Sequence, residues 1–133
     1  MGYFEHDADI GVIGCGATPE AAFVAAAEAM FGIMVNTRAL RDERHIVFEF
    51  DETDLELAFV TWLNRLLAEA RRHGLALCRF GLRRGGSRWL GEAWGQAWDD
   101  TIVPGTEVKG ATLTMLSVRA AASGWEARCV VDV

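Results

Sequence analysis

Acidic residues stand at both ends of this chain, each beside residues typical of a β-strand. Asp9 comes just before Ile10 and Gly11, and Asp132 lies between an apolar run and Val133. A carboxylate beside buried strand residues is costly to desolvate unless a cation or a set of hydrogen-bond donors meets it. These two positions are therefore the first candidates for a functional site. The alternative is that Asp9 caps a turn and that Asp132 is a solvated residue near a chain end.

The composition bounds the domain organisation and the classes of partner. With 133 residues and 51% hydrophobic content, the chain is expected to form a single globular domain over residues 1–133. Its formal net charge of −6 argues against a domain that holds nucleic-acid phosphates by bulk electrostatics. Any link to RNA or DNA is therefore expected to run through a protein partner.

Cysteine usage and the N-terminal residues predict the compartment. Cys15, Cys78 and Cys129 are odd in number, far apart and without the Cys-x-x-Cys spacing of zinc or redox sites. We interpret them as free thiols in a reducing cytoplasm. The first residues have neither a basic nor an apolar signal region, and no apolar run is long enough to span a membrane. We expect a soluble, cytoplasmic protein without a membrane partner.

Apolar residues at spacings of three and four predict two helices. The first covers Pro19–Met34, with Thr18 as its N-cap and proline at the first helical position. For the second, Thr53 and Glu56 have the spacing of a capping box ahead of an apolar stripe. This helix is expected to end near His73, before a glycine that is free to take a left-handed conformation.

Extended segments surround the two helices. Ile46–Phe50, Ala76–Leu82 and Trp125–Val131 have the apolar patterns and lengths of strands. Turn residues at 85–87 and 123–124 predict hairpins. Strands without a regular βαβ repeat favour an α+β fold. We expect a single-domain sandwich in which two helices pack on a mainly antiparallel sheet.

Short motifs along nearly the whole chain match those of one family in order. They are His6–Gly11, Pro19–Phe23, Ala29–Val35, Trp62–Leu67, Gly91–Glu92, Val108–Thr112 and Arg128–Val133. Together they resemble the archease family, with its N-terminal H-[ST]-A-D-[IV] signature, its W-L-N-x-L-L helix motif and its V-K-[AG]-x-T strand. The final motif resembles the family's terminal strand, which ends in an acid and an aliphatic residue.

The resemblance implies a protein that assists a GTP-dependent RNA ligase of the RtcB type in tRNA splicing and RNA repair. Such a protein speeds guanylylation of the ligase and lets it turn over repeatedly. It is not itself an enzyme, and it meets RNA and GTP only through the ligase. By this likeness Asp9 and Asp132 are ligands of a divalent cation, calcium or magnesium. Val133 is the remaining protein ligand, through its carboxylate or its carbonyl. Lys109 is the lysine that serves ligase activation.

Other interpretations of the same residues stay open. Lys109 has the alternative of an outward-facing strand residue paired with an acid. His6 either orients Asp9 or is a polar residue at a strand edge. For the whole protein, one alternative is a hydrolase or transferase that uses the carboxylates and a metal for its own catalysis. Another is a small protein-binding chaperone module in which the acids are structural.

Three further features bear on function. Leu113–Thr114 stand where a Tyr-His pair commonly follows the family's V-K-A-x-T strand, and the segment 94–101 lacks a histidine often found after the Gly-Glu pair. These departures indicate either a divergent branch with an altered ligase partner or a member that has lost part of the activity. Trp89, Trp94 and Trp98 form either an exposed docking patch or part of the sheet core.

Overall fold

The computed structural model describes residues 3–6 and 9–133. Asp7 and Ala8 lie outside the described residues, as does the side chain of His6, so neither interpretation of His6 is tested. In chain order the elements are β1 (Tyr3–His6), β2 (Asp9–Gly16), α1 (Pro19–Met34), the 3-10 helix η1 (Thr37–Ala39), β3 (Arg44–Asp51), α2 (Leu55–His73), β4 (Leu75–Gly85), β5 (Arg88–Ala97), β6 (Gly110–Ala111), β7 (Ser117–Ala121) and β8 (Gly124–Asp132). The predicted α+β class is confirmed.

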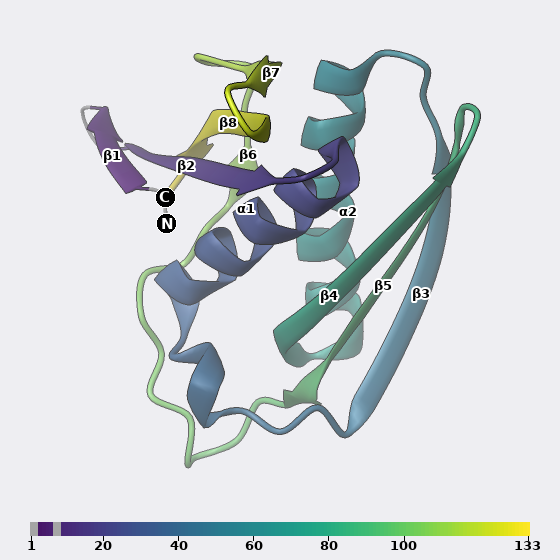
Figure 1. Cartoon of the computed structure of the whole chain (residues 1–133). Helices are drawn as coiled ribbons and strands as arrows, with labels where there is room; N and C mark the ends of the chain where they lie inside the picture. Colours follow the sequence, from purple (N-terminus) through teal and green to yellow (C-terminus); the bar gives the residue numbers. More distant parts are fainter. Residues whose placement is uncertain (1–2, 7–8) are drawn as a thin grey trace.

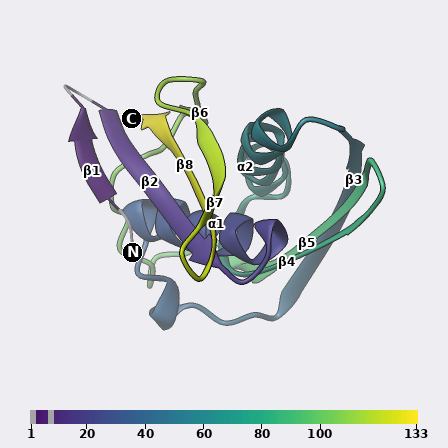
Figure 2. The ribbon, with the colours of Figure 1, turned by 45° about the horizontal axis from the view of Figure 1, so that its top comes forward.

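The strands form two antiparallel sheets. In the first the order is β1-β2-β8-β6, with β7 also paired to β8, and in the second it is β3-β5-β4. Figure 1 and Figure 2 show α1 between the sheets, in contact with β2 and β8 of one and β4 of the other. Division into two sheets was not predicted. It explains why α1 is apolar around so much of its circumference, since a helix covered on opposite sides has little exposed face.

Capping residues set the ends of both helices. The hydroxyl of Thr18 accepts a hydrogen bond from the main-chain N–H of Ala21 at 3.1 Å, as the sequence predicts. The predicted capping box at Thr53 is wrong by one residue, because the carboxylate of Asp54 accepts the bond from the N–H of Leu57 at 3.0 Å. Both residue types are good N-caps, so spacing alone did not separate them. At the other end, Gly74 closes α2 in the left-handed region with φ 65°.

The core joins the two helices to the second sheet through aromatic side chains. Phe23 of α1 lies 5.0 Å from Phe59 and 5.4 Å from Trp89 between ring centroids. Trp62, fully buried on α2, donates its indole N–H to the carbonyl of Phe23 at 2.9 Å. A buried indole N–H needs a hydrogen-bond acceptor. This bond therefore ties α2 to the backbone of α1 at Phe23.

The three tryptophans of β5 and the loop after it do not form one patch. Trp89 is fully buried, whereas Trp94 lies between the ring of His45, 4.6 Å away, and the guanidinium of Arg79, 3.8 Å away. Trp98 is 43% exposed beyond the end of β5. Alternation along the strand sends Trp89 and Trp94 to opposite faces of the sheet. The docking-patch interpretation is therefore wrong for Trp89.

All three cysteines are free thiols, as predicted. Cys129 is fully buried in β8, and this burial raises the pKa of its thiol to about 12. In the part of the chain that the structure describes, no helix has the length and apolar character needed to span a membrane.

Candidate functional site

The two predicted acidic residues lie on neighbouring strands at one end of the first sheet. β2 and β8 are antiparallel, and their register ends with Ile10 opposite Val131, so Asp9 and Asp132 are the next residues outward on the two neighbouring strands. Ile10 and Val131 pack in the core. Because side chains alternate between the two faces of a strand, both aspartates point to the opposite face, away from the helices. Figure 2 shows the beginning of β2 beside the end of β8, close to the point marked C.

This arrangement sets two negative charges side by side. Directly opposed residues in an antiparallel pair have Cβ atoms about 5 Å apart, and like charges there destabilise the pair by roughly 0.2–1 kcal/mol. Among the residues whose side chains the structure describes, which are 3 and 9–133, neither aspartate has an ion-pair partner within 4.0 Å. His6, the strand partner of Asp9 in β1, is not among them. On the other side of β8, Asp132 is opposite Gly110, which adds no side chain. The place is therefore electrostatically suited to a cation.

The donor set is chemically suited to a hard divalent cation but is incomplete. Carboxylate and main-chain oxygens are the ligands that calcium and magnesium prefer. Among the described residues, no group of three or more His, Cys, Asp or Glu side chains is placed to hold a metal ion. A cation at Asp9 and Asp132 would therefore need other oxygens. Those of Val133, whose side chain packs partly against the core, come directly after Asp132.

Lys109 is tied to Asp132 through the main chain. Its N–H donates to the carbonyl of Asp132 at 2.7 Å, just before the two-residue strand β6. Its side chain is exposed, and it is the single lysine of the sequence beside twelve arginines. Lysine carries a compact point charge on a flexible stem, whereas arginine is a planar fork, so the two are not interchangeable. Among the residues whose side chains are described, no acid lies within ion-pair distance of the Lys109 ammonium, and both interpretations of this lysine stay predictions.

Helix α2 holds the segment that carries Lys109. The carboxamide of Asn64 makes two hydrogen bonds with the main chain of Ala111, accepting from the N–H at 2.8 Å and donating to the carbonyl at 3.1 Å. Two turns further along, the guanidinium of Arg71 donates to the carbonyls of Val108 at 2.7 Å and Lys109 at 3.0 Å. Both partners act through the backbone, so they leave the lysine ammonium free.

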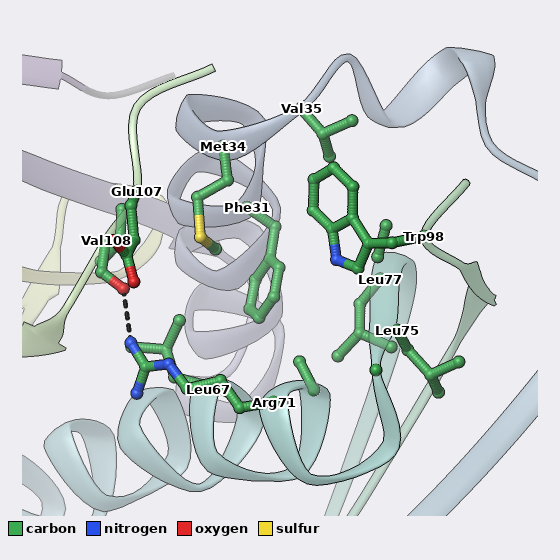
Figure 3. A pocket seen from close by; sticks show the side chains of 13 residues that line it. Phe31, Met34, Val35, Leu67, Arg71, Leu75, Leu77, Trp98, Glu107 and Val108 are labelled. Carbon is green, nitrogen blue, oxygen red and sulfur yellow. Dashed lines mark hydrogen bonds between the residues drawn. The ribbon is translucent and has the colours of Figure 1, made fainter. Parts of the chain in front are cut away.

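A cavity of about 320 Å³ lies on the other side of this segment. Figure 3 shows Arg71 at one wall, bonded to the carbonyl of Val108, with Trp98 across the space from it. Most of the lining is apolar and includes Phe31 and Leu67. Glu107 contributes a carboxylate beside Val108. The cavity thus borders the Lys109 segment but is separate from the aspartates.

The loop between β6 and β7 contains the Leu113–Thr114 departure. Thr112 keeps its place beside β8, because its N–H and hydroxyl both donate to the carbonyl of Val130 at 3.0 and 2.8 Å. The chain then turns outward, with Leu113 64% exposed and Met115 at φ 54°. In place of a titratable pair, this loop presents apolar side chains to solvent.

Sequence reasoning named four positions that the fold places near one another, and it missed two residues that hold the segment of Lys109. Asp9, Asp132, Val133 and Lys109 meet at one end of the first sheet, although their metal-binding and activating roles stay predictions. Asn64 and Arg71 were assigned no part in the site. A signal for Asn64 exists in the sequence, since asparagine is a weak helix former placed in the middle of an apolar helix.

Comparisons with known proteins identify the family of the chain. The model of the Archease protein family (MTH1598/TM1083) matches residues 1–133. The chain belongs to the archease family. Among its relatives are the proteins named archease from Pyrococcus furiosus, 34% identical with 98% of this chain and 96% of the relative covered, and from Thermococcus gammatolerans, 33% identical with the same coverage. The archease of Saccharolobus solfataricus is 30% identical over the same shares of both chains.

The fold is also that of a solved relative. The solution structure of Methanobacterium thermoautotrophicum protein 1598 matches with a TM-score of 0.84 and 23% sequence identity, covering 98% of this chain and 96% of the other. At this level of identity the likeness is one of fold. It agrees with the two-sheet arrangement that brings the chain ends together.

Proposed function

We propose that this chain activates a GTP-dependent RNA ligase of the RtcB type, as the family resemblance implies, and is not itself the catalyst. The observation that supports the proposal most directly is that Asp9 and Asp132 come just beyond the last pair of the neighbouring strands β2 and β8, with the backbone of the single lysine bonded to Asp132. An acidic protein of net charge −6 is poorly suited to hold RNA itself. It is better suited to act on a protein that does.

In this proposal Asp9, Asp132 and a main-chain or terminal oxygen of Val133 hold calcium or magnesium. When bound, the cation neutralises the carboxylates and leaves coordination positions open to a partner. The chain's own part is to fix these oxygens on two paired strands and to keep them at the surface. Lys109, anchored by its backbone, supplies a cationic side chain beside them for a phosphate or carboxylate of the ligase complex.

The test is a mixture of the purified chain with the ligase, GTP and a divalent cation. We expect guanylylated ligase to form faster, with the effect present well below one equivalent of the chain because an activator is released after each transfer. Deletion of Val133 removes one donor and moves the chain terminus, so it should weaken cation binding and activation together. GTP or RNA turnover by the chain alone, unchanged by this deletion, would instead support the hydrolase or transferase alternative.

The chaperone-module alternative makes a different prediction in the same assay. A module in which the acids are only structural would bind its partner without a cation and would not change the rate of guanylylation. Activation that persists in the presence of a chelator would therefore go against the cation site, even if the ligase is the partner.

A further inference from the structure

In the part of the chain that the structure describes, the segment that carries Lys109 has a strand neighbour on one side only. β6 comprises Gly110–Ala111 and pairs with Val131 and Asp132 of β8 at the edge of the sheet. Lys109 and Thr112, on either side of this pair, also donate main-chain hydrogen bonds to the carbonyls of Asp132 and Val130 at 2.7 and 3.0 Å. The contact with β8 is still shorter than an ordinary strand of about five or six residues. The other edge of β6 pairs with no strand among the described residues, so its main-chain polar groups need other partners.

Asn64 provides what a neighbouring strand would provide. Its carboxamide presents one acceptor and one donor, and both are used by the N–H and the carbonyl of one residue, Ala111, at 2.8 and 3.1 Å. Among the side chains, only the carboxamides of asparagine and glutamine offer this pair of groups in one plane. An aspartate would lose the donor and place a charge against the carbonyl. The chemistry of the contact thus explains why an asparagine stands in the middle of α2.

We propose that Asn64 is a positioning residue that fixes Lys109 relative to Asp132 by clamping Ala111 against β8. Ala111 lies two residues after Lys109, and its partner Val131 lies next to Asp132. A shift of the clamp would thus move the lysine backbone relative to the acidic pair. The assignment of Lys109 and Asp132 to ligase activation rests on the proposed function, whereas the clamp itself rests on these hydrogen bonds.

The contacts of Arg71 and Glu56 separate this role from general support by the helix. Arg71 bonds to the carbonyls of Val108 and Lys109 and so acts on the same segment. Glu56, at the start of α2, accepts a hydrogen bond from the N–H of Val118 at 3.4 Å, on β7. Glu56 therefore supports the same edge of the sheet as Asn64 does. Its partner Val118 lies seven residues further along the chain than Ala111. Glu56→Ala is the matched control for loss of one helix-to-edge contact.

The experiment compares Asn64→Leu, Asn64→Gln and Glu56→Ala, each as the full chain. The leucine side chain has nearly the shape of asparagine without its hydrogen bonds, and glutamine restores the carboxamide. At 25 °C, where circular dichroism confirms folding, we expect Asn64→Leu to lower the maximal rate of ligase guanylylation at saturating activator at least tenfold. Asn64→Gln should recover part of that loss, and Glu56→Ala should stay within twofold of the unsubstituted chain.

A double substitution tests whether Asn64 acts through Lys109. If it does, Asn64→Leu combined with Lys109→Ala should be no slower than Lys109→Ala alone, because residues that act as one unit are not additive. Multiplication of the two losses would overturn the proposal. So would an equal loss of maximal rate in Asn64→Leu and Glu56→Ala, which indicates a purely structural contribution.

Amide hydrogen exchange keeps the clamp testable without the ligase. Asn64→Leu should speed exchange in residues 109–112 at least tenfold, while exchange in β2 is unchanged. Unchanged exchange at 109–112 would overturn the clamp. If exchange rises as expected but the unsubstituted chain fails to accelerate the ligase, the proposed function fails and the positioning of Lys109 stands.

Discussion

The N–H of Lys109 donates to the carbonyl of Asp132 across 2.7 Å, so the single lysine and the last acidic residue of the sequence are held by one main-chain bond. The bond does not use the side chain of either residue. This bond therefore fixes the two backbones and leaves the ammonium and the carboxylate available to a ligand or a partner. This is what a site that acts in trans requires, because a preorganised group loses less entropy when it binds.

The charge of Asp132 has opposite expected effects with and without a cation. Without one, Asp132→Asn removes the repulsion from Asp9 and should leave stability unchanged or raise it by roughly 0.2–1 kcal/mol. With calcium at about a hundred times its dissociation constant, the unsubstituted chain should gain about 2.7 kcal/mol, or about 10 °C in melting temperature. Asp132→Asn should lose most of that gain. Differential scanning fluorimetry in chelator and in calcium measures both effects.

Asp100→Asn is the matched control, because Asp100 is an exposed acid in the loop after β5. It should keep the full calcium response. A calcium response in Asp132→Asn equal to that of the unsubstituted chain would remove Asp132 from the cation site.

The local structure followed from the sequence where one physical signal dominated. Thr18 followed by a proline predicted where α1 begins, and Gly74 predicted where α2 ends. The signal failed where two residues could do the same work, as at Thr53 and Asp54. Capping depends on which side chain meets the free N–H groups of the first turn, and that geometry is decided by the incoming chain.

The site was predictable only in part. The acids were recognisable because carboxylates beside apolar strand residues need an explanation, and the family motifs pointed to Lys109. Their adjacency depends on the pairing of β2 with β8, a contact between the two ends of the sequence that no local pattern encodes. The clamp from Asn64 to Ala111 joins residues 47 positions apart for the same reason. Periodicity predicts elements, whereas their pairing is decided by packing of the whole domain.

The N-cap of α2 can be assigned by two substitutions. Asp54→Ala removes the acceptor for the N–H of Leu57 and should cost about 1 kcal/mol, or about 4 °C in melting temperature. Thr53→Ala should change stability by less than about 0.5 kcal/mol, as an exposed substitution away from a cap does. Urea denaturation of both variants measures the difference. A larger loss in Thr53→Ala than in Asp54→Ala would restore the capping box at Thr53.

Cys129 should make stability depend on alkaline pH. Because burial raises the pKa of its thiol to about 12 from the ordinary 9.0, the folded state excludes the thiolate. This contribution to stability is complete below the unfolded pKa near 9.0 and is lost as pH rises from there toward 12. Thermal melts from pH 8 to pH 11 should therefore fall more steeply for the unsubstituted chain than for Cys129→Ala. Parallel curves would show that the thiol ionises equally in both states.

Lys109 should matter for activation and little for stability. Its side chain is exposed and has no acid within ion-pair distance among the described residues, so Lys109→Ala should change the free energy of unfolding by less than about 0.5 kcal/mol. Ligase guanylylation should nevertheless slow at least tenfold, with Lys109→Arg recovering little because a planar fork does not replace a point charge. Arg83→Ala, which removes an exposed cation of β4, is the control and should activate normally. Full activation by Lys109→Ala would make Lys109 an ordinary surface charge.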